Sequence, residues 1–196
     1  MTLPRVLVLT DRAQLRAGRT LPETVAACAR GGATCVVMRE IDLSHEARAA
    51  LAAELTRIPD LVLITARTWF PGASAVHLSA AQSAADAGGA PFHGNSCHDE
   101  AEVRRAVTAG ASYVTVSPAA RSDSKPGYGP PLGVSGVRRL VAFAEGMPVF
   151  ALGGVDPGNA RSFLDAGAHG VAVMGPLMRA DDPAATMEKL LTEVGR

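Results

Sequence analysis

Short runs of apolar residues alternate with longer amphipathic segments along the whole chain. Eight of these runs have the length of buried β-strands and are bounded by polar residues, glycine or proline. We expect strands at Val6–Thr10, Thr34–Arg39, Leu61–Thr65, Ala75–Leu78, Pro91–Ser96, Ser112–Val116, Val149–Leu152 and Gly170–Met174. Helical periodicity lies between them, at Thr24–Ala29, Ser44–Thr56, His98–Ala109, Gly136–Ala144 and Asn159–Asp165. The helical segments after the third and fourth strands are short.

Strict alternation of strands and helices predicts a parallel sheet, and eight strands can close it into a barrel. We therefore expect a single (β/α)₈ TIM-barrel domain over residues 1–196, with a doubly wound open sheet as the alternative. Helix boundaries support the assignment, because Asp156-Pro157 and Asp182-Pro183 are typical helix starts and Gly167 is a typical helix end.

The segment from Pro148 to Arg179 carries the strongest functional signal. Its first strand runs into Gly153-Gly154, and its second runs into Gly175 and a short helical turn. The loops after the last two strands of such barrels commonly bind phosphate, and glycine lets backbone N–H groups approach an anion closely. We expect these glycines to bind the phosphate group of a small molecule.

A long loop from Ser117 to Gly133 follows the sixth strand. It places Arg121, Ser122, Ser124 and Lys125 close together in the sequence, and such donors and cations suit a phosphate. A loop of this length in a small domain is usually functional or disordered. A solvated surface loop with incidental charges is the alternative.

Polar residues also stand at the ends of the second and fifth strands, where active sites of these barrels lie. Arg39 would face the barrel mouth if it alternates in step with Cys35 and Val37, although Arg39-Glu40 could instead be a surface ion pair. At the fifth strand, Ser96 and His98 fall on one side of the chain.

The same alternation places Cys97 on the opposite side, which argues against a Cys97–His98 nucleophile pair. His98-Asp99 could equally be an ordinary helix start. His77 lies within an apolar strand, where a packed core histidine is the simpler interpretation.

Composition excludes several classes of partner. Lys plus Arg equals Asp plus Glu at 19 each, which argues against nucleic acid or an anionic membrane surface. The sequence contains no apolar run of transmembrane length and no signal-peptide pattern. Three cysteines without metal-like spacing indicate a reduced, cytoplasmic setting, and neither cofactor nor metal is expected. A homodimer is possible, and the sequence does not give the oligomeric state.

These motifs, taken in order, resemble the superfamily of thiamin phosphate synthase and the TenI-type thiazole tautomerase. The likeness covers essentially the whole chain and is best in GASYVTVSP with the SDSK loop, PVFALGGVDPGN and GAHGVAVMG. The resemblance implies that Ser122, Ser124 and Lys125 take the places of a Thr-x-Thr-Lys loop, and that Gly153 and Gly154 match a double glycine. This half would hold the phosphate of a thiazole phosphate.

The amino half departs from the synthase pattern. The resemblance places two acidic magnesium ligands where this chain has Ala66 and Gln82, and a lysine where it has Ile41. Mg²⁺ prefers carboxylate oxygens and neutralises a diphosphate leaving group, so their loss should slow that reaction by on the order of 10³-fold. Glu40 is the obvious substitute ligand.

The tautomerase relative needs only a phosphate site and groups that move a proton. Its catalytic histidine corresponds to Ser117, and its last-strand serine to Gly175, so His98 would be the base, with Arg39 and Ser96 beside it. We therefore expect metal-independent tautomerisation of a phosphorylated heterocycle. The alternatives are a synthase that joins a pyrimidine diphosphate to a thiazole phosphate with Mg²⁺, and a non-catalytic regulator that binds such phosphates.

Overall fold

The computed structural model describes residues 3–121 and 130–195. Its eight strands form one closed, fully parallel barrel in which each strand pairs with its neighbours in chain order and β8 pairs with β1. The strands are β1 (Val6–Leu9), β2 (Cys35–Met38), β3 (Val62–Ala66), β4 (Ala75–Leu78), β5 (His93–Cys97), β6 (Tyr113–Val116), β7 (Val149–Leu152) and β8 (Gly170–Val173). The predicted (β/α)₈ barrel is confirmed, and the open-sheet alternative is wrong.

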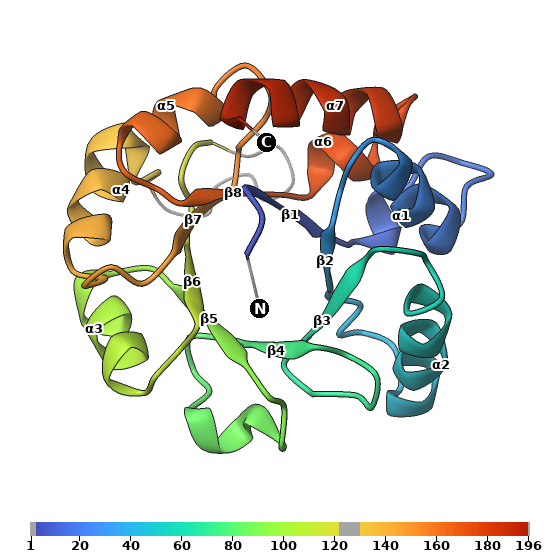
Figure 1. The fold of residues 1–196 in the computed structure, drawn as a ribbon, viewed down its shortest axis with the longest axis horizontal. Helices are drawn as coiled ribbons and strands as arrows, with labels where there is room; N and C mark the ends of the chain where they lie inside the picture. The colour runs from blue at the N-terminus through green and yellow to red at the C-terminus, as the bar shows by residue number, and fades with distance from the viewer. Residues whose placement is uncertain (1–2, 122–129, 196) are drawn as a thin grey trace.

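Helices surround the ring of strands (Figure 1). They are α1 (Leu21–Arg30), α2 (His45–Leu55), α3 (Glu100–Thr108), α4 (Gly133–Ala142), α5 (Ala160–Asp165), α6 (Gly175–Met178) and α7 (Pro183–Val194). Short 3₁₀ turns add η1 (Arg12–Gln14) and η2 (Ala84–Ala87). The segment between β3 and β4 contains no helix, and η2 alone follows β4, so both short segments are confirmed.

Helix starts differ from the sequence prediction by one to three residues; α3 begins at Glu100 rather than His98, and α4 at Gly133 rather than Gly136. Helix α1 begins at Leu21 rather than Thr24, because Thr20 and Glu23 form a reciprocal capping box. Helix α5 begins at Ala160 with Asn159 at its N-cap position, and Asp156 instead accepts a hydrogen bond from the Gly158 N–H in the preceding turn. Local capping chemistry sets the first residue of a helix more sharply than the apolar pattern does.

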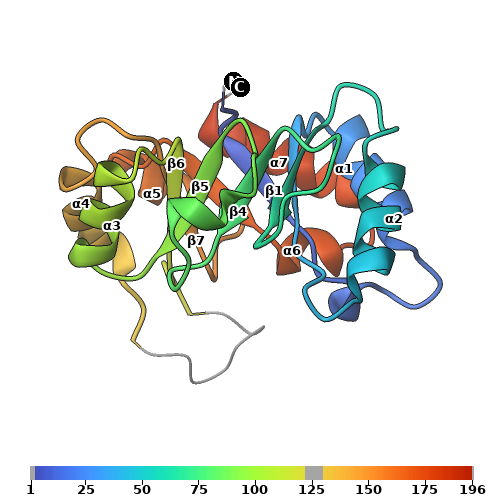
Figure 2. The same cartoon turned by 90° about the horizontal axis from the view of Figure 1, so that it is seen from below.

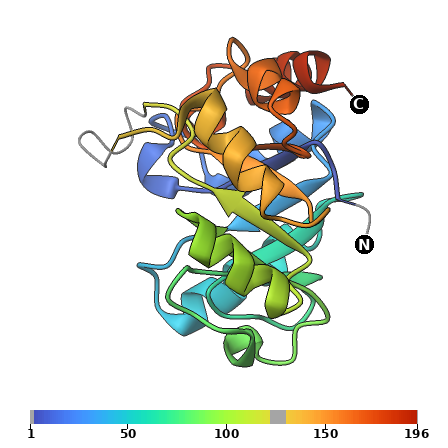
Figure 3. The ribbon, with the colours of Figure 1, turned by 90° about the vertical axis from the view of Figure 1, so that its left-hand side faces the viewer.

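Both termini lie at one end of the barrel, the end at which the strands begin (Figure 2). The opposite end, where the strands finish, is called the mouth here. In side view, α3 and α4 pack along the outside of the strands (Figure 3).

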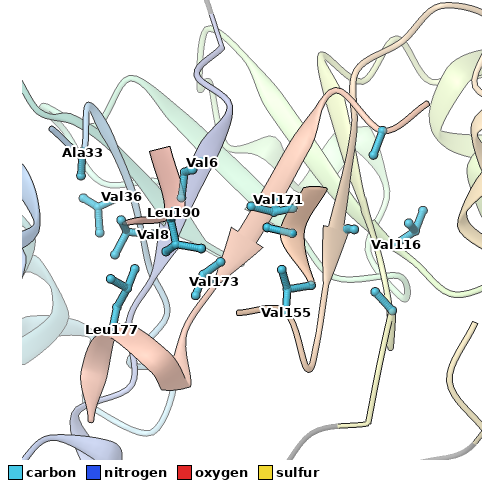
Figure 4. Close-up of a cluster of buried hydrophobic side chains, with 14 of the residues drawn as sticks. Val6, Val8, Ala33, Val36, Val116, Val155, Val171, Val173, Leu177 and Leu190 are labelled. Atoms are coloured by element: carbon cyan, nitrogen blue, oxygen red, sulfur yellow. The ribbon is translucent and has the colours of Figure 1, made fainter. Parts of the chain in front are cut away.

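Apolar side chains fill two separate spaces. The larger cluster lies between strands and helices. Val171 and Val173 of β8 belong to it and face the helices α6 and α7, which contribute Leu177 and Leu190 (Figure 4). The second cluster fills the barrel interior with Leu7, Leu9, Cys35, Val37, Ile64, Ala66, Ala75, Tyr113, Phe150 and Ala172. Within the described ranges, no helix is long and apolar enough to cross a membrane.

Candidate active site

Strand alternation brings Arg39 to the mouth of the barrel. Cys35 and Val37 belong to the interior cluster, and the Arg39 guanidinium reaches toward β8, where Nη1 lies 2.7 Å from Met174 Sδ. The predicted inward orientation is therefore confirmed. The alternative Arg39–Glu40 surface pair is wrong, because Glu40 pairs with Arg12 instead.

Ser96 and His98 occupy successive levels of the mouth. Ser96 stands opposite Thr115 in the β5–β6 register, and its Oγ lies 2.9 Å from His77 Nε2. One level further, His98 Nδ1 lies 2.9 Å from the Ser117 carbonyl oxygen and 3.3 Å from Ser117 Oγ. The structure thus brings His98 together with Ser117, the position at which the resemblance places a catalytic histidine.

The contact with Ser117 fixes the tautomer of a neutral His98 ring. A carbonyl oxygen can only accept a hydrogen bond, so the 2.9 Å contact requires a hydrogen on Nδ1. Nε2 of the neutral ring then carries the lone pair, which is the arrangement that a general base needs. His98 also precedes the helix start, since its N–H donates to Glu102 Oε2 and Asp99 caps α3. His98 therefore stands directly before the start of α3, and this position still allows its side chain to act as a base.

Cys97 takes no part in this arrangement. It is buried in the outer cluster, and burial raises the pKa of its thiol to about 12. His77 is also buried, with both ring nitrogens hydrogen-bonded inside the barrel. Its interpretation as a packed core residue is confirmed, although the sequence did not reveal that it contacts Ser96.

The glycines after β7 have a steric role that the sequence did not show. Gly153 and Gly154 have φ angles of +93° and +65°. A Cβ on Gly154 would overlap the backbone of Ala120 and Arg121, which cross directly over it. These glycines therefore let the segment after β6 pack against the end of β7, where Ala120 N–H donates to the Gly153 carbonyl.

Gly175 is buried at the end of β8, and the guanidinium of Arg179 lies over it, so that a Cβ would come within 2.6 Å of Nη1. The N–H groups of Gly154 and Gly175 donate to no other residue in the described ranges. These N–H groups can therefore serve an external acceptor, as the phosphate prediction requires. Ser122, Ser124 and Lys125 lie outside the described residues. Nothing in the local sequence around Arg179 indicates that its side chain folds back over Gly175, so the sequence alone does not identify it.

Two residues near the expected magnesium site are used in other contacts: Glu40, the suggested substitute ligand, and Gln82, which stands where the resemblance places an acid. The Glu40 side chain is only 2% exposed, and it accepts hydrogen bonds from the backbone N–H and the guanidinium of Arg12. Gln82 Oε1 accepts from the Ser79 N–H, and its Nε2 donates to the Arg67 carbonyl. These contacts argue against Glu40 as the substitute ligand.

Two arginines lie close together beside Ala66. Arg48 is buried behind Ala66 and donates a hydrogen bond to its carbonyl oxygen. Burial lowers the pKa of Arg48, and the nearby positive charge of Arg67 lowers it further. Across residues 3–121 and 130–195, no three His, Cys, Asp or Glu side chains form a group that could hold a metal ion. The described side chains do not fit the divalent cation that the resemblance implies.

A closed parallel barrel with polar groups gathered at its mouth is the architecture of small-molecule enzymes of the TIM-barrel class. The family model for thiamine monophosphate synthase matches residues 6–177. Thiamine-phosphate synthases of Roseiflexus castenholzii and Haloarcula marismortui are each 34% identical to this chain, over 94% and 95% of it and 86% and 95% of their own lengths. The chain belongs to the thiamine monophosphate synthase family.

A solved structure supports the fold. Thiamine phosphate pyrophosphorylase from Pyrococcus furiosus superimposes with a TM-score of 0.85 at 24% identity, over 97% of this chain and 95% of that protein. Because the 34% identical synthases match along nearly the whole chain, the chain is a family enzyme related to thiamine biosynthesis. The relatives are named thiamine-phosphate synthases, which is the alternative to tautomerisation given above.

Proposed function

We propose that this chain binds a thiazole phosphate at the mouth of the barrel and catalyses metal-independent proton transfer on it. The observation that carries the proposal is the pairing of His98 with Ser117, which leaves the lone pair of the neutral ring on Nε2. The N–H groups of Gly154 and Gly175 supply donors for the phosphate. Arg39 adds positive charge beside the end of β8, where its Nη1 lies 2.7 Å from Met174 Sδ.

In this reaction His98 Nε2 accepts a proton from a carbon of the bound heterocycle, and the imidazolium returns it to a different ring position. The carbanion character that develops between the two steps is favoured by the positive charge of Arg39. The residues named need only bind, orient and move one proton.

A second candidate is transfer of a pyrimidine from its diphosphate to the thiazole phosphate, because relatives that align along nearly the whole chain are named for that activity. The side chains at positions 40, 66 and 82 oppose it, since none offers a carboxylate to a magnesium diphosphate.

The test is proton exchange on the unisomerised carboxythiazole phosphate in D₂O, followed by NMR. General acid–base catalysis contributes roughly 10²–10⁴-fold, so His98→Gln should slow exchange by about that factor and leave binding of the thiazole phosphate intact. His169→Gln is the matched control, because His169 is also half-buried but directly precedes β8 at the opposite end of the barrel.

Exchange that is equally fast in the His98→Gln variant would contradict the proposal. Formation of thiamin phosphate from the two phosphorylated substrates at an enzymatic rate would establish the second candidate. Binding of the thiazole phosphate without either reaction would establish the regulatory alternative.

A further inference from the structure

A chain of hydrogen bonds runs through the barrel interior beneath the mouth. The hydroxyl oxygen of Tyr113 lies 3.0 Å from His77 Nδ1, and His77 Nε2 lies 2.9 Å from Ser96 Oγ. Thr115 Oγ1 is 3.5 Å from the same Nε2. Tyr113 and His77 are buried, whereas Ser96 is half-buried at the mouth. The chain therefore links the interior of the barrel to a side chain that a ligand can reach.

A glycine in the intervening strand makes this contact between non-adjacent strands possible. Gly94 of β5 pairs with His77 of β4 on one side and with Tyr113 of β6 on the other. A Cβ on Gly94 would overlap the Tyr113 ring, so the ring crosses β5 at the one residue without a side chain. The ring also packs edge-on against Phe150, with centroids 5.7 Å apart. Packing thus holds the tyrosine hydroxyl against His77.

His77 is neutral in the folded protein. Burial, and to a smaller extent the charge of Arg39, lowers its pKa to about 4. A neutral imidazole has one donor nitrogen and one acceptor nitrogen. Its two contacts must therefore run in the same direction along the chain, either from Tyr113 toward Ser96 or from Ser96 toward Tyr113.

The buried hydroxyl of Tyr113 decides the direction. His77 Nδ1 is its only hydrogen-bond partner in the described ranges. If the tyrosine accepted from Nδ1–H, its own hydrogen would be buried without an acceptor, which is strongly unfavourable. The tyrosine therefore donates to Nδ1, and Nε2–H donates to Ser96 Oγ.

We propose that Tyr113 and His77 are positioning residues that fix Ser96 as a hydrogen-bond donor to the bound heterocycle. Because Ser96 Oγ accepts from His77, its own hydrogen is directed to another acceptor at the mouth. A thiazole phosphate held at β7 and β8 would reach β5 with its ring end, so the acceptor is a ring heteroatom or a carboxylate on the ring. This ligand assignment rests on the proposed function; the direction of the hydrogen bonds does not.

The first arm of the test needs no ligand. Imidazole ¹⁵N NMR shifts at neutral pH distinguish the two neutral tautomers. We expect His77 to carry its hydrogen on Nε2 in the wild type, and to lose this preference in Tyr113→Phe. A wild-type His77 with its hydrogen on Nδ1 would overturn the inference, whatever the protein binds.

The second arm is a double-mutant cycle on binding of the carboxythiazole phosphate by calorimetry. Ser96→Ala should weaken binding about fivefold, the usual range for one hydrogen bond, and Tyr113→Phe should weaken it by a similar or smaller factor. The double variant should bind no more weakly than Ser96→Ala alone, because the tyrosine acts through the serine. A merely structural role for Tyr113 predicts instead that the two factors multiply, which would overturn the inference.

Thr24→Val is the matched control, since it removes a buried hydroxyl that bonds within α1 and should leave affinity unchanged. If the wild type does not bind the probe, the proposed function fails and the ligand role of Ser96 fails with it. The NMR arm still decides the direction of the hydrogen bonds.

Discussion

The buried, neutral state of His77 makes a specific prediction about stability and pH. Its pKa is about 4 in the folded protein, mainly because burial disfavours the charged ring. In the unfolded chain a histidine has a pKa near 6.5. Between these values the unfolded state binds a proton that the native state does not, so the free energy of unfolding falls as the pH falls. The contribution is fully present above about pH 6.5 and is lost toward pH 4.

The size of the effect follows from the two pKa values. A depression of about 2.5 units corresponds to about 3 kcal/mol, of which roughly 2.5 kcal/mol is lost between pH 7 and pH 4.5. Carboxylates such as Asp42, whose pKa is lowered by its hydrogen bond with Arg12, add their own acid sensitivity. A comparison with a His77→Gln variant removes these shared contributions, because glutamine does not titrate.

The assay is urea unfolding at pH 7 and pH 4.5, followed by the fluorescence of the single tryptophan, Trp69. We expect the stability advantage of the wild type over His77→Gln to shrink by about 2.5 kcal/mol at the lower pH. Thr24→Val, which removes no titrating group, should show a difference from wild type that is independent of pH. A constant difference for His77→Gln as well would refute the reasoning that His77 is held neutral.

Two further predictions concern packing and thiol chemistry. Gly94→Ala should lower the free energy of unfolding by about 2 kcal/mol or more, because the new Cβ displaces the Tyr113 ring; unchanged urea unfolding would contradict this crossing of the barrel. Cys28, Cys35 and Cys97 are all buried, and burial raises the pKa of each thiol to about 12. A thiol reagent at pH 7.5 should therefore label none of the three in the native protein and all three in urea. Rapid labelling of the native protein would contradict their burial.

Much of the site could be predicted because it depends on strand alternation. The apolar run before Arg39 is short and regular, so its inward orientation follows from counting residues. The same counting separates Ser96 from Cys97. The predicted phosphate site cannot be derived from strand alternation in this way. Gly154 and Gly175 have N–H groups without an acceptor in the described ranges, but the positive φ angles of Gly153 and Gly154 also serve the packing of the segment after β6.

The sequence by itself determined the parallel α/β architecture, because eight buried runs alternate with helical segments. The pairing of β8 with β1 closes this sheet into a barrel, where a doubly wound fold would leave it open. Only the tertiary structure decided that Glu40 is occupied by Arg12, and that Tyr113 reaches His77 across Gly94. These contacts join residues 28 and 36 positions apart. They depend on the register between strands and on the direction of long side chains, which local patterns do not encode. A carboxylate that looks available in the sequence can therefore be used internally, whereas a core histidine can set the hydrogen-bonding direction of a residue at the mouth.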